Sequence, residues 1–176
     1  MKRPLFSLLI CLTVLPFVGL AQGEPGWNKM TFGANFELSV PMGDFQFIAG
    51  NGYGGNVRFQ YGQSALAAFT ATAGYLVWTT KDLGGNTSIQ PQAFNLFLGG
   101  KYYFAPGFFG TLEGGLYFMT YTYTGSLLGA YGNATRFMLP IGLGYQKSGF
   151  EVSARYMLLY YEFNSFSFTV GYNFAL

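Results

Sequence analysis

The sequence predicts an all-β protein, a single eight-stranded antiparallel up-and-down transmembrane β-barrel. The first observation is that apolar and small polar side chains alternate in about eight segments, which gives each strand one apolar face. Alternation alone also fits a soluble barrel with an apolar inside. The second observation decides between the two: charged residues make up 9% of the chain and aromatic residues 20%, whereas ordinary soluble domains carry about 25% charge. The apolar faces are therefore predicted to point outward, toward lipid.

The N-terminal segment is predicted to be a secretory signal peptide over residues 1–21, which leaves 22–176 as the barrel domain. Lys2 and Arg3 precede an apolar run over 5–20, and Ala21 supplies a small residue for cleavage. The run is shorter than the roughly twenty residues of a membrane-spanning helix. A lipoprotein signal would use Cys11, but Ile10 stands where a small residue is expected. The sequence therefore predicts export.

The first four strands are predicted over residues 30–41, 53–62, 65–78 and 91–104. Their outward faces carry large side chains such as Phe36, Phe59, Phe69 and Phe94, while the residues between them are mostly Gly, Thr, Asn and Gln. An eight-stranded barrel has an interior just wide enough for side chains. Small inward residues, including many of the 26 glycines, are therefore a packing requirement.

The last four strands are predicted over residues 108–121, 135–146, 150–161 and 165–176. The final strand alternates without a fault, with Phe166, Phe168 and Val170 on one face and Ser167 and Thr169 on the other. Pro140 lies inside the strand over 135–146. Because proline removes a ladder hydrogen bond, we expect a β-bulge there.

The connections alternate in length. Those over 41–52, 79–90 and 122–134 are long, and those over 62–65, 105–107 and 147–149 are short; the last, around 162–165, is also short. Outer-membrane barrels have short periplasmic turns and longer external loops. We therefore expect the long connections to lie outside the cell and both termini of the barrel to lie in the periplasm.

Seven charged residues fall on inward faces by alternation. They are Glu37, Arg58, Lys101, Glu113, Arg136, Glu151 and Arg155. Isolated charges in a narrow lumen are costly, so opposite charges should pair. We expect Glu113 near Lys101 across the 105–107 turn, and Glu37 beside Arg58 on the neighbouring strand. A static salt-bridge network that closes the lumen is favoured over a gated polar path.

Several functions are disfavoured by composition. The chain has no histidine, and its one cysteine leaves with the signal, so neither a histidine-based hydrolytic site nor a thiolate metal site is available. A carboxylate pair such as Asp44 with Asp82 has no supporting spacing. Without Lys2 and Arg3 the cationic residues fall from 9 to 7 and equal the acidic ones, which disfavours nucleic acid. We predict no enzyme, no cofactor and no metal.

The glycine-rich stretch 50–55 matches the dinucleotide fingerprint, G-x-G-x-x-G. That fingerprint needs a following helix, but the next residues alternate as a strand. The glycines are therefore interpreted as shaping a junction between loop and strand.

Aromatic residues near the strand ends are predicted to form girdles at the membrane interfaces. On the loop side these are Tyr75, Trp78, Tyr121, Tyr123, Tyr160 and Tyr161. On the turn side they are Phe32, Tyr61, Phe104, Phe108, Tyr145 and Phe150. Ligand stacking is the alternative role for them.

The chain resembles the small eight-stranded outer-membrane barrels of the outer-membrane protein A and X type, and most of all the outer membrane protein β-barrel domain common in Bacteroidota. The motifs are Pro41-Met42-Gly43-Asp44-Phe45, the stretch 50–55, Tyr61-Gly62, Gly74-Tyr75, 100–104 and the closing Gly171-Tyr172-Asn173-Phe174. The resemblance implies a bacterial outer-membrane location. It also implies recognition of the last strand, through Tyr172, Phe174 and Leu176, by the barrel assembly machinery, although the family's usual last residue is aromatic.

The resemblance does not select one function, because such barrels range over membrane integrity, adhesion and small-molecule passage. We expect a monomer that contacts outer-membrane lipid and lipopolysaccharide. The leading function is a plugged barrel with a structural or loop-mediated contact role. The alternative is a narrow porin-like channel for small solutes, or an entry for an apolar ligand near Phe45, Phe47 and Ile48.

Overall fold

The computed structural model describes residues 29–84, 87–125, 131–159 and 164–176, and the predicted signal peptide lies outside them. The strands are β1 (Met30–Pro41), β2 (Gly52–Gly62), β3 (Ala67–Trp78), β4 (Lys81–Gly84), β5 (Thr87–Ala105), β6 (Phe108–Gly125), β7 (Tyr131–Lys147), β8 (Phe150–Leu159) and β9 (Ser165–Ala175), with a short helix α2 (Phe45–Ile48). In the described residues no helix has the length and apolar character to cross a membrane.

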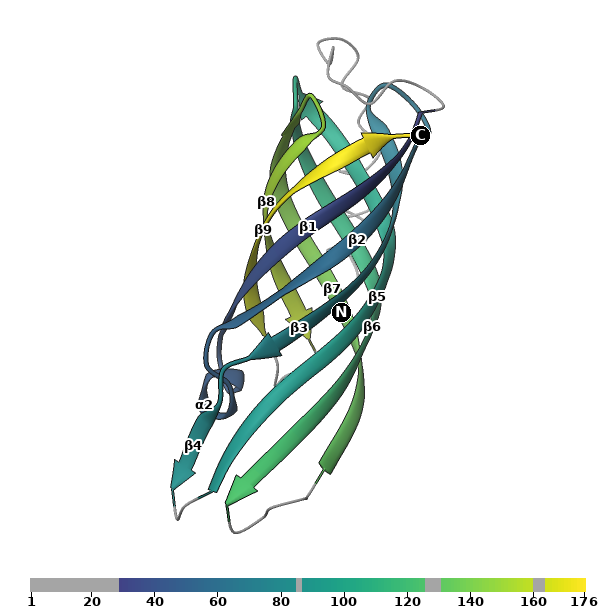
Figure 1. Cartoon of the computed structure of the whole chain (residues 1–176). Helices are drawn as coiled ribbons and strands as arrows, with labels where there is room; N and C mark the ends of the chain where they lie inside the picture. The colour runs from purple at the N-terminus through teal and green to yellow at the C-terminus, as the bar shows by residue number, and fades with distance from the viewer. Residues whose placement is uncertain (1–28, 85–86, 126–130, 160–163) are drawn as a thin grey trace, which may run out of the picture.

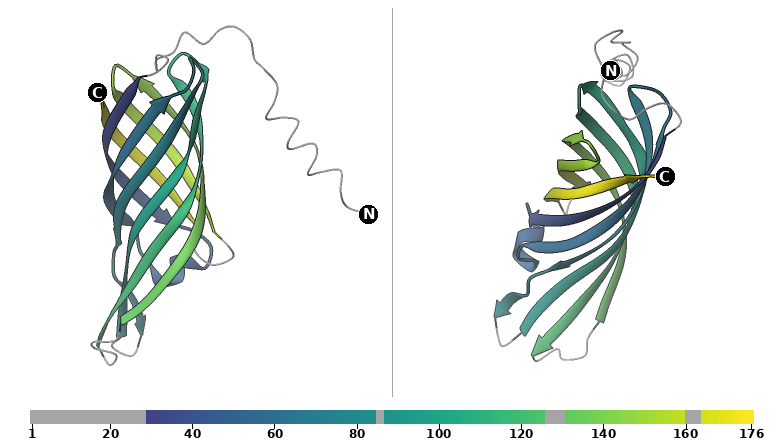
Figure 2. Two further views of the ribbon diagram at one scale, coloured as in Figure 1. Left: turned by 90° about the vertical axis from the view of Figure 1, so that its right-hand side faces the viewer. Right: turned by 45° about the horizontal axis from the view of Figure 1, so that its top comes forward.

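The strands close into an eight-stranded barrel in which every pairing is antiparallel (Figures 1 and 2). The order β3-β2-β1-β9-β8-β7-β6-β5 closes through the pairing of β3 with β5, and β4 continues the line of β3 along β5. The predicted all-β architecture, a barrel of eight antiparallel strands, is therefore confirmed, and the first and last strands, β1 and β9, pair with each other.

The strands β5, β6 and β7 are longer than predicted. The segments 79–90 and 122–134, expected as loops, contain β4, the start of β5, the end of β6 and the start of β7. Their hairpins extend beyond the rest of the barrel at the end opposite the C-terminus (Figure 1). The alternating Thr-Tyr-Thr-Tyr-Thr of 120–124 explains this, because β-branched and aromatic residues favour strands.

Pro140 causes no bulge, and that expectation is wrong. Leu112 pairs with Ile141 and Gly115 with Met138, so the register of β6 against β7 is the same on both sides of the proline. Pro140 also stays in register with Met157 on β8. The missing N–H interrupts the β6–β7 pairing without inserting an extra residue.

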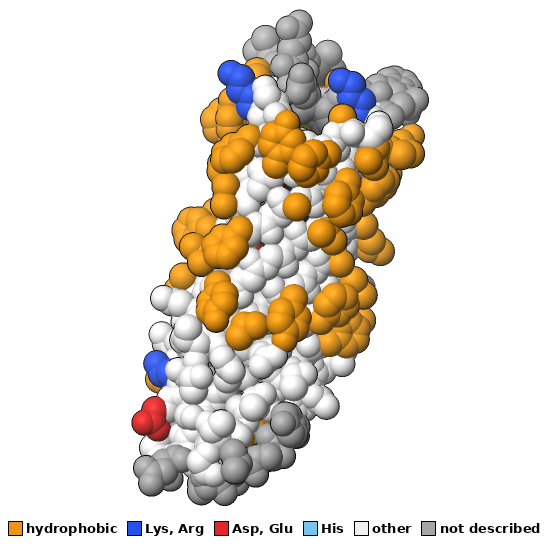
Figure 3. Space-filling model, in the orientation of Figure 1, with side chains coloured by type: hydrophobic (Ala, Val, Ile, Leu, Met, Phe, Trp, Pro, Cys, Tyr) orange, Lys and Arg blue, Asp and Glu red, His pale blue; other side chains and the backbone are white. Residues whose placement is uncertain are grey.

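Large apolar side chains cover the outside of the barrel as a band, bounded by Lys or Arg at the turn end (Figure 3). On β5 the band runs from Phe94 to Phe104, both exposed. That is roughly ten residues, which at about 3.3 Å per residue and a tilt of about 40° give a height of about 25 Å. This height matches the apolar band of barrels that span a bilayer, and the opposite end of the molecule lacks such a band on the face shown.

Two inward glycines leave room for larger interior side chains. A Cβ on Gly99 would lie 2.2 Å from the Leu112 carbonyl oxygen and 2.9 Å from Cγ of Glu113, and one on Gly142 would lie 2.7 Å from Cγ of Arg155. Side chains at these positions would displace the charged residues beside them. The charged side chains of Glu113 and Arg155 therefore fill the interior space that Gly99 and Gly142 leave free.

Candidate functional site: the barrel interior

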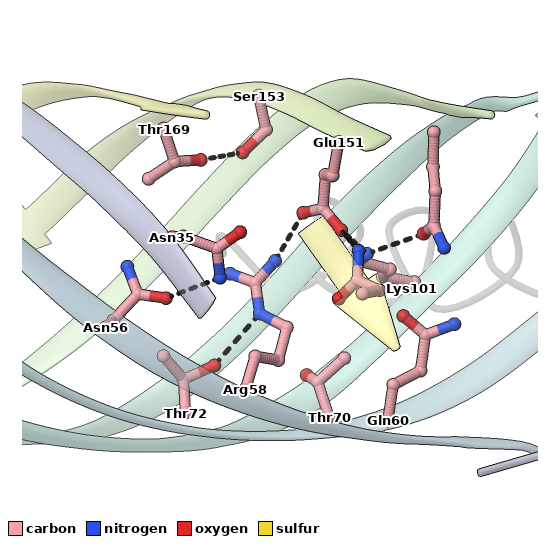
Figure 4. Close-up of polar contacts among 12 residues, drawn as sticks. Asn35, Asn56, Arg58, Gln60, Thr70, Thr72, Lys101, Glu151, Ser153 and Thr169 are labelled. Carbon is pink, nitrogen blue, oxygen red and sulfur yellow. Dashed lines mark hydrogen bonds and ion pairs between the residues drawn. The ribbon is translucent and has the colours of Figure 1, made fainter. Parts of the chain in front are cut away.

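Six charged side chains form a chain of alternating sign inside the barrel. Its order is Glu37, Arg155, Glu113, Arg58, Glu151 and Lys101. Figure 4 shows three of them, Arg58, Glu151 and Lys101. Arg155 joins Glu37 at 2.8 Å and Glu113 at 3.2 Å. Arg58 lies 3.8 Å from Glu113 and 2.6 Å from Glu151, and Lys101 ends the chain 2.5 Å from Glu151. Three carboxylates thus balance three cations, all of them buried.

Neutral polar side chains add hydrogen bonds to the three carboxylates, although Oε1 of Glu37 and Nη2 of Arg58 have no hydrogen-bond partner among the described residues. Thr70 and Thr72 donate hydrogen bonds to Oε1 of Glu113 at 2.9 and 3.1 Å. Asn56 donates to Glu37 and Asn173 donates to Glu151, each at 2.9 Å. Such additional bonds offset part of the cost of burying an ion pair.

Every strand of the barrel wall contributes to this polar layer. Besides the charged residues of β1, β2, β5, β6 and β8, the threonines lie on β3, Asn173 on β9 and Gln146 on β7. Gln146 accepts a hydrogen bond from Nζ of Lys101 at 3.1 Å. The polar interior therefore connects all eight positions around the barrel.

The structure brings together six of the seven residues that the sequence places inside. Arg136 is exposed, so it is not part of this buried layer. It has the inward parity of Met138, which pairs with Leu159, the last residue of β8 that the structure describes before residue 164. Arg136 thus lies on the part of β7 beyond the described pairing with β8.

The expected partners within the network are wrong. Lys101 pairs with Glu151 on β8 instead of Glu113, and Glu37 pairs with Arg155 on β8 instead of Arg58. Arg58 sits opposite Gly33 on β1, whereas Glu37 sits opposite Gly54 on β2, so the two are four residues apart along the strands. The long side chains reach beyond the neighbouring strands because the barrel is narrow, so adjacency in the wall does not select the partner.

Aromatic rings close the turn end of the lumen. Tyr103 and Phe109 are fully buried, with ring centroids 5.6 Å apart. Nζ of Lys101 lies 4.2 Å from the Phe109 centroid, within cation–π range. The Tyr103 hydroxyl donates to Gln146 at 2.9 Å and accepts from Gln60 at 3.2 Å. This end is closed by both packing and hydrogen bonds.

A second aromatic layer closes the loop end. Phe45 of α2 packs edge-on against Trp78 with centroids 5.2 Å apart, and Trp78 lies 6.4 Å from Tyr117. Phe97 packs against Tyr117 at 5.5 Å. A cavity between Phe45, Trp78 and Tyr117 measures about 10 Å³, which is about the space of one water molecule. The helix α2 therefore places Phe45 in the mouth of the barrel, where Phe45, Trp78, Tyr117 and Phe97 form a plug.

Three of the predicted loop-side girdle residues belong to this interior layer. Trp78 and Tyr121 are buried, 2% and 8% exposed, and half-buried Tyr123 packs against the same cluster, so their placement in the girdle is wrong. All three have inward parity, since Leu76 and Met119, which precede them in the alternation, are buried too. Tyr75 is exposed as expected, whereas Tyr160 and Tyr161 lie outside the described residues.

The residues that the sequence reasoning missed are the closing aromatics. In the alternation, Tyr103 points to the same side as Lys101, Phe109 to the same side as Thr111, and Trp78 to the same side as Leu76. The alternation therefore already indicated that these three aromatic rings point inward. Phe45 has no such signal, because it lies in a connection. Of the three residues proposed to admit an apolar ligand, Phe45 fills the mouth itself, while Phe47 is 66% exposed.

The remaining candidate motifs form no site. Gly52 begins β2, so a strand and not a helix follows the glycine-rich stretch 50–55, as expected. Among the described residues no group of three His, Cys, Asp or Glu side chains could hold a metal ion.

Comparison with known proteins supports the fold. The structure is similar to the crystal structure of Ail, the attachment invasion locus protein of Yersinia pestis, with a TM-score of 0.67 and 10% sequence identity over 85% of this chain and 99% of that chain. The TM-score is below 0.5 for two other structures, the N-terminal β-barrel domain of Pseudomonas aeruginosa OprF (0.47, 18% identity, 85% and 100% coverage) and Neisserial surface protein A (0.48, 11%, 84% and 96%).

No family model and no curated protein sequence matches the chain. The fold is that of small eight-stranded outer-membrane barrels. The more specific resemblance to the Bacteroidota domain stays a prediction.

Proposed function

We propose that this chain is an integral protein of the bacterial outer membrane, and that its barrel is plugged and has a structural or surface-contact role. The observation that carries this proposal is the closed interior. The alternating charge chain from Glu37 to Lys101 lies between two aromatic layers, at Tyr103 and Phe109 on one side and at Trp78 and Phe45 on the other. The outer apolar band of about 25 Å supports insertion in a bilayer.

The hairpins beyond the band are the surface that such a protein would present outside the cell. The β4–β5 and β6–β7 hairpins extend past the apolar side chains (Figures 1 and 3). These hairpins lengthen β5, β6 and β7 but do not extend the lipid-facing band. A surface of this kind supports a role in contacts outside the cell. The 10% identity to Ail carries no particular partner over to this chain.

Export and assembly follow the same proposal. The signal peptide over 1–21 would direct the chain to the periplasm, and the barrel assembly machinery would recognise the outward face of β9. That face carries exposed Tyr172, Phe174 and Leu176. β9 closes the barrel against β1 over the register from Thr31–Ala175 to Pro41–Ser165, and a barrel closed within one chain supports a monomer.

Membrane fractionation and heat modification test the proposal. The tagged full-length chain should co-sediment with outer-membrane markers. Its unboiled band in SDS should migrate differently from its boiled band, since folded barrels resist SDS. An epitope inserted after Gly125 should be detected on intact cells, and one inserted after Lys147 only after permeabilisation. Recovery in the soluble periplasmic fraction, or a band that does not shift on boiling, would contradict the proposal.

A further inference from the structure

On the outer face of the extended hairpins, the side chains change from apolar to polar between one outward-facing residue and the next. Phe94 pairs with Phe118 on the outside, and the next outward pair is Gln92 with Thr120. On β7 the same change occurs between Phe137 and Thr135. The residues of opposite parity, Ile89, Met119 and Tyr121, are buried, so the polar side chains beyond the change point outward.

The polar residues form one surface, which we call the hydroxyl–amide patch. It consists of Gln90, Gln92, Thr120, Thr122, Asn133 and Thr135, all exposed or half-buried. Gln92 pairs with Thr120, Gln90 with Thr122 and Asn133 with Thr120, so the three strands hold them side by side. The segments 87–92, 119–125 and 131–135 contain no charged residue.

The height of this wall exceeds a phospholipid headgroup layer. From Phe118 to Thr124 the strand rises by about 20 Å, and at a tilt of about 40° this is about 15 Å along the membrane normal. The headgroup region on each side of a bilayer is about 5–8 Å thick. The patch therefore reaches a level that only a lipid with a larger polar headgroup occupies.

The chemistry of the patch matches a sugar. Hydroxyls donate and accept hydrogen bonds, and side-chain amides do both as well, as sugar hydroxyls require. Phosphate recognition favours Arg or Lys, which these segments lack. One existing contact shows the geometry: the Tyr75 hydroxyl, on the rim of the apolar band, donates to Gln92 at 2.5 Å.

We propose that the hydroxyl–amide patch binds the oligosaccharide headgroup of the glycolipid in the outer leaflet around the barrel. The patch continues the lipid-facing wall of β5, β6 and β7 without a break, so the molecule whose acyl chains cover Phe94 and Phe118 places its headgroup against Gln92 and Thr120. This inference rests on the proposed outer-membrane placement and names the part of the lipid that is recognised.

The test compares three vesicles that contain the refolded protein. All are phosphatidylcholine; one adds rough lipopolysaccharide with its core oligosaccharide, and one adds lipid A, which lacks the core. The readout is the midpoint temperature at which the heat-resistant SDS band disappears. Ligand binding to the folded state raises that midpoint. We expect core-bearing lipopolysaccharide to raise it by a few degrees above lipid A.

Thr120→Val/Thr122→Val removes two hydroxyls and keeps β-branched side chains of similar shape. We expect this variant to fold and to lose most of the increment between lipid A and core-bearing lipopolysaccharide. The control, Gln46→Ala/Thr80→Ala, changes exposed polar residues at the same end of the barrel but outside the patch, and it should keep the increment. Asn133→Ala provides a second variant on β7, with a partial loss expected.

Equal midpoints of the wild-type protein in lipid A and in core-bearing lipopolysaccharide would overturn the inference, as would an unchanged increment in the valine variant. The inference would also be overturned if soluble core oligosaccharide raised the midpoint temperature as much as core-bearing lipopolysaccharide does. The ligand of the patch would then be a free glycan instead of a lipid headgroup. Failure to insert in any vesicle would instead contradict the proposed outer-membrane placement.

Discussion

The guanidinium of Arg155 donates a hydrogen bond to Oε2 of Glu37 at 2.8 Å, between residues 118 positions apart in the sequence. Arg155 lies on β8 and Glu37 on β1, two strands that do not pair, because β9 lies between them. The contact therefore passes over the inner face of β9. Backbone hydrogen bonds connect β1 and β8 each to β9 but not to each other. This ion pair therefore links two strands that share no backbone pairing.

Replacing Arg155 by Met should destabilise the barrel strongly. The change removes the cation between Glu37 and Glu113 and leaves both carboxylates buried without it. Breaking a buried pair from one side costs about 3–5 kcal/mol. Urea unfolding of the refolded protein in lipid vesicles measures the loss. Lys81→Met, at an exposed position on β4, should change the free energy of unfolding by less than about 0.5 kcal/mol, and equal losses for both would refute a buried network.

Glu113→Gln should also destabilise the barrel, because Glu113 accepts hydrogen bonds from Thr70, Thr72 and Arg155. The double variant with Arg155→Met should lose less free energy of unfolding than the sum of the losses in the two single variants. Each single change leaves the other member of the Arg155–Glu113 pair without its partner, whereas the double change removes both members. We expect a coupling energy of about 0.5–3 kcal/mol from the double-mutant cycle. Strictly additive losses would mean that the two side chains do not interact.

Gly99→Ala should destabilise the barrel much more than Gly110→Ala. A Cβ at residue 99 would meet the Leu112 carbonyl oxygen at 2.2 Å and Cα of Glu113 at 2.5 Å, whereas a Cβ at residue 110 has its nearest neighbours at 3.8 Å. Overpacking costs about 1–3 kcal/mol. Unfolding midpoints in the same vesicles compare the two alanine variants. Similar midpoints would contradict the close approach of the wall to Glu113.

Trp78→Ala should lower the free energy of unfolding by about 3–5 kcal/mol, since it removes a large buried ring from the plug. It should not make the barrel conduct, because the charge chain and the layer of Tyr103 and Phe109 still close the lumen below it. Conductance of the folded variant in a planar bilayer checks the second point. Steady current steps in this variant alone would identify Trp78 as the single barrier.

Alternation and low charge were sufficient to predict the strand number, the direction of each face and the six buried charges. They were not sufficient to pair those charges, because Glu37 and Lys101 find partners on strands that are not their neighbours, and no local pattern in the sequence records that proximity. Arg136 has the same parity as the buried residues, yet its side chain is exposed. Phe45 enters the plug from a connection, where alternation gives no information.

The most direct test of a plugged barrel is the conductance of the refolded protein, residues 22–176, in a planar lipid bilayer, with folding verified by the heat-dependent shift of its band in SDS. We predict a silent bilayer at protein levels that give efficient insertion. Discrete, reproducible current steps that change when Glu113 is replaced by Gln would contradict the closed lumen and favour a channel for small solutes.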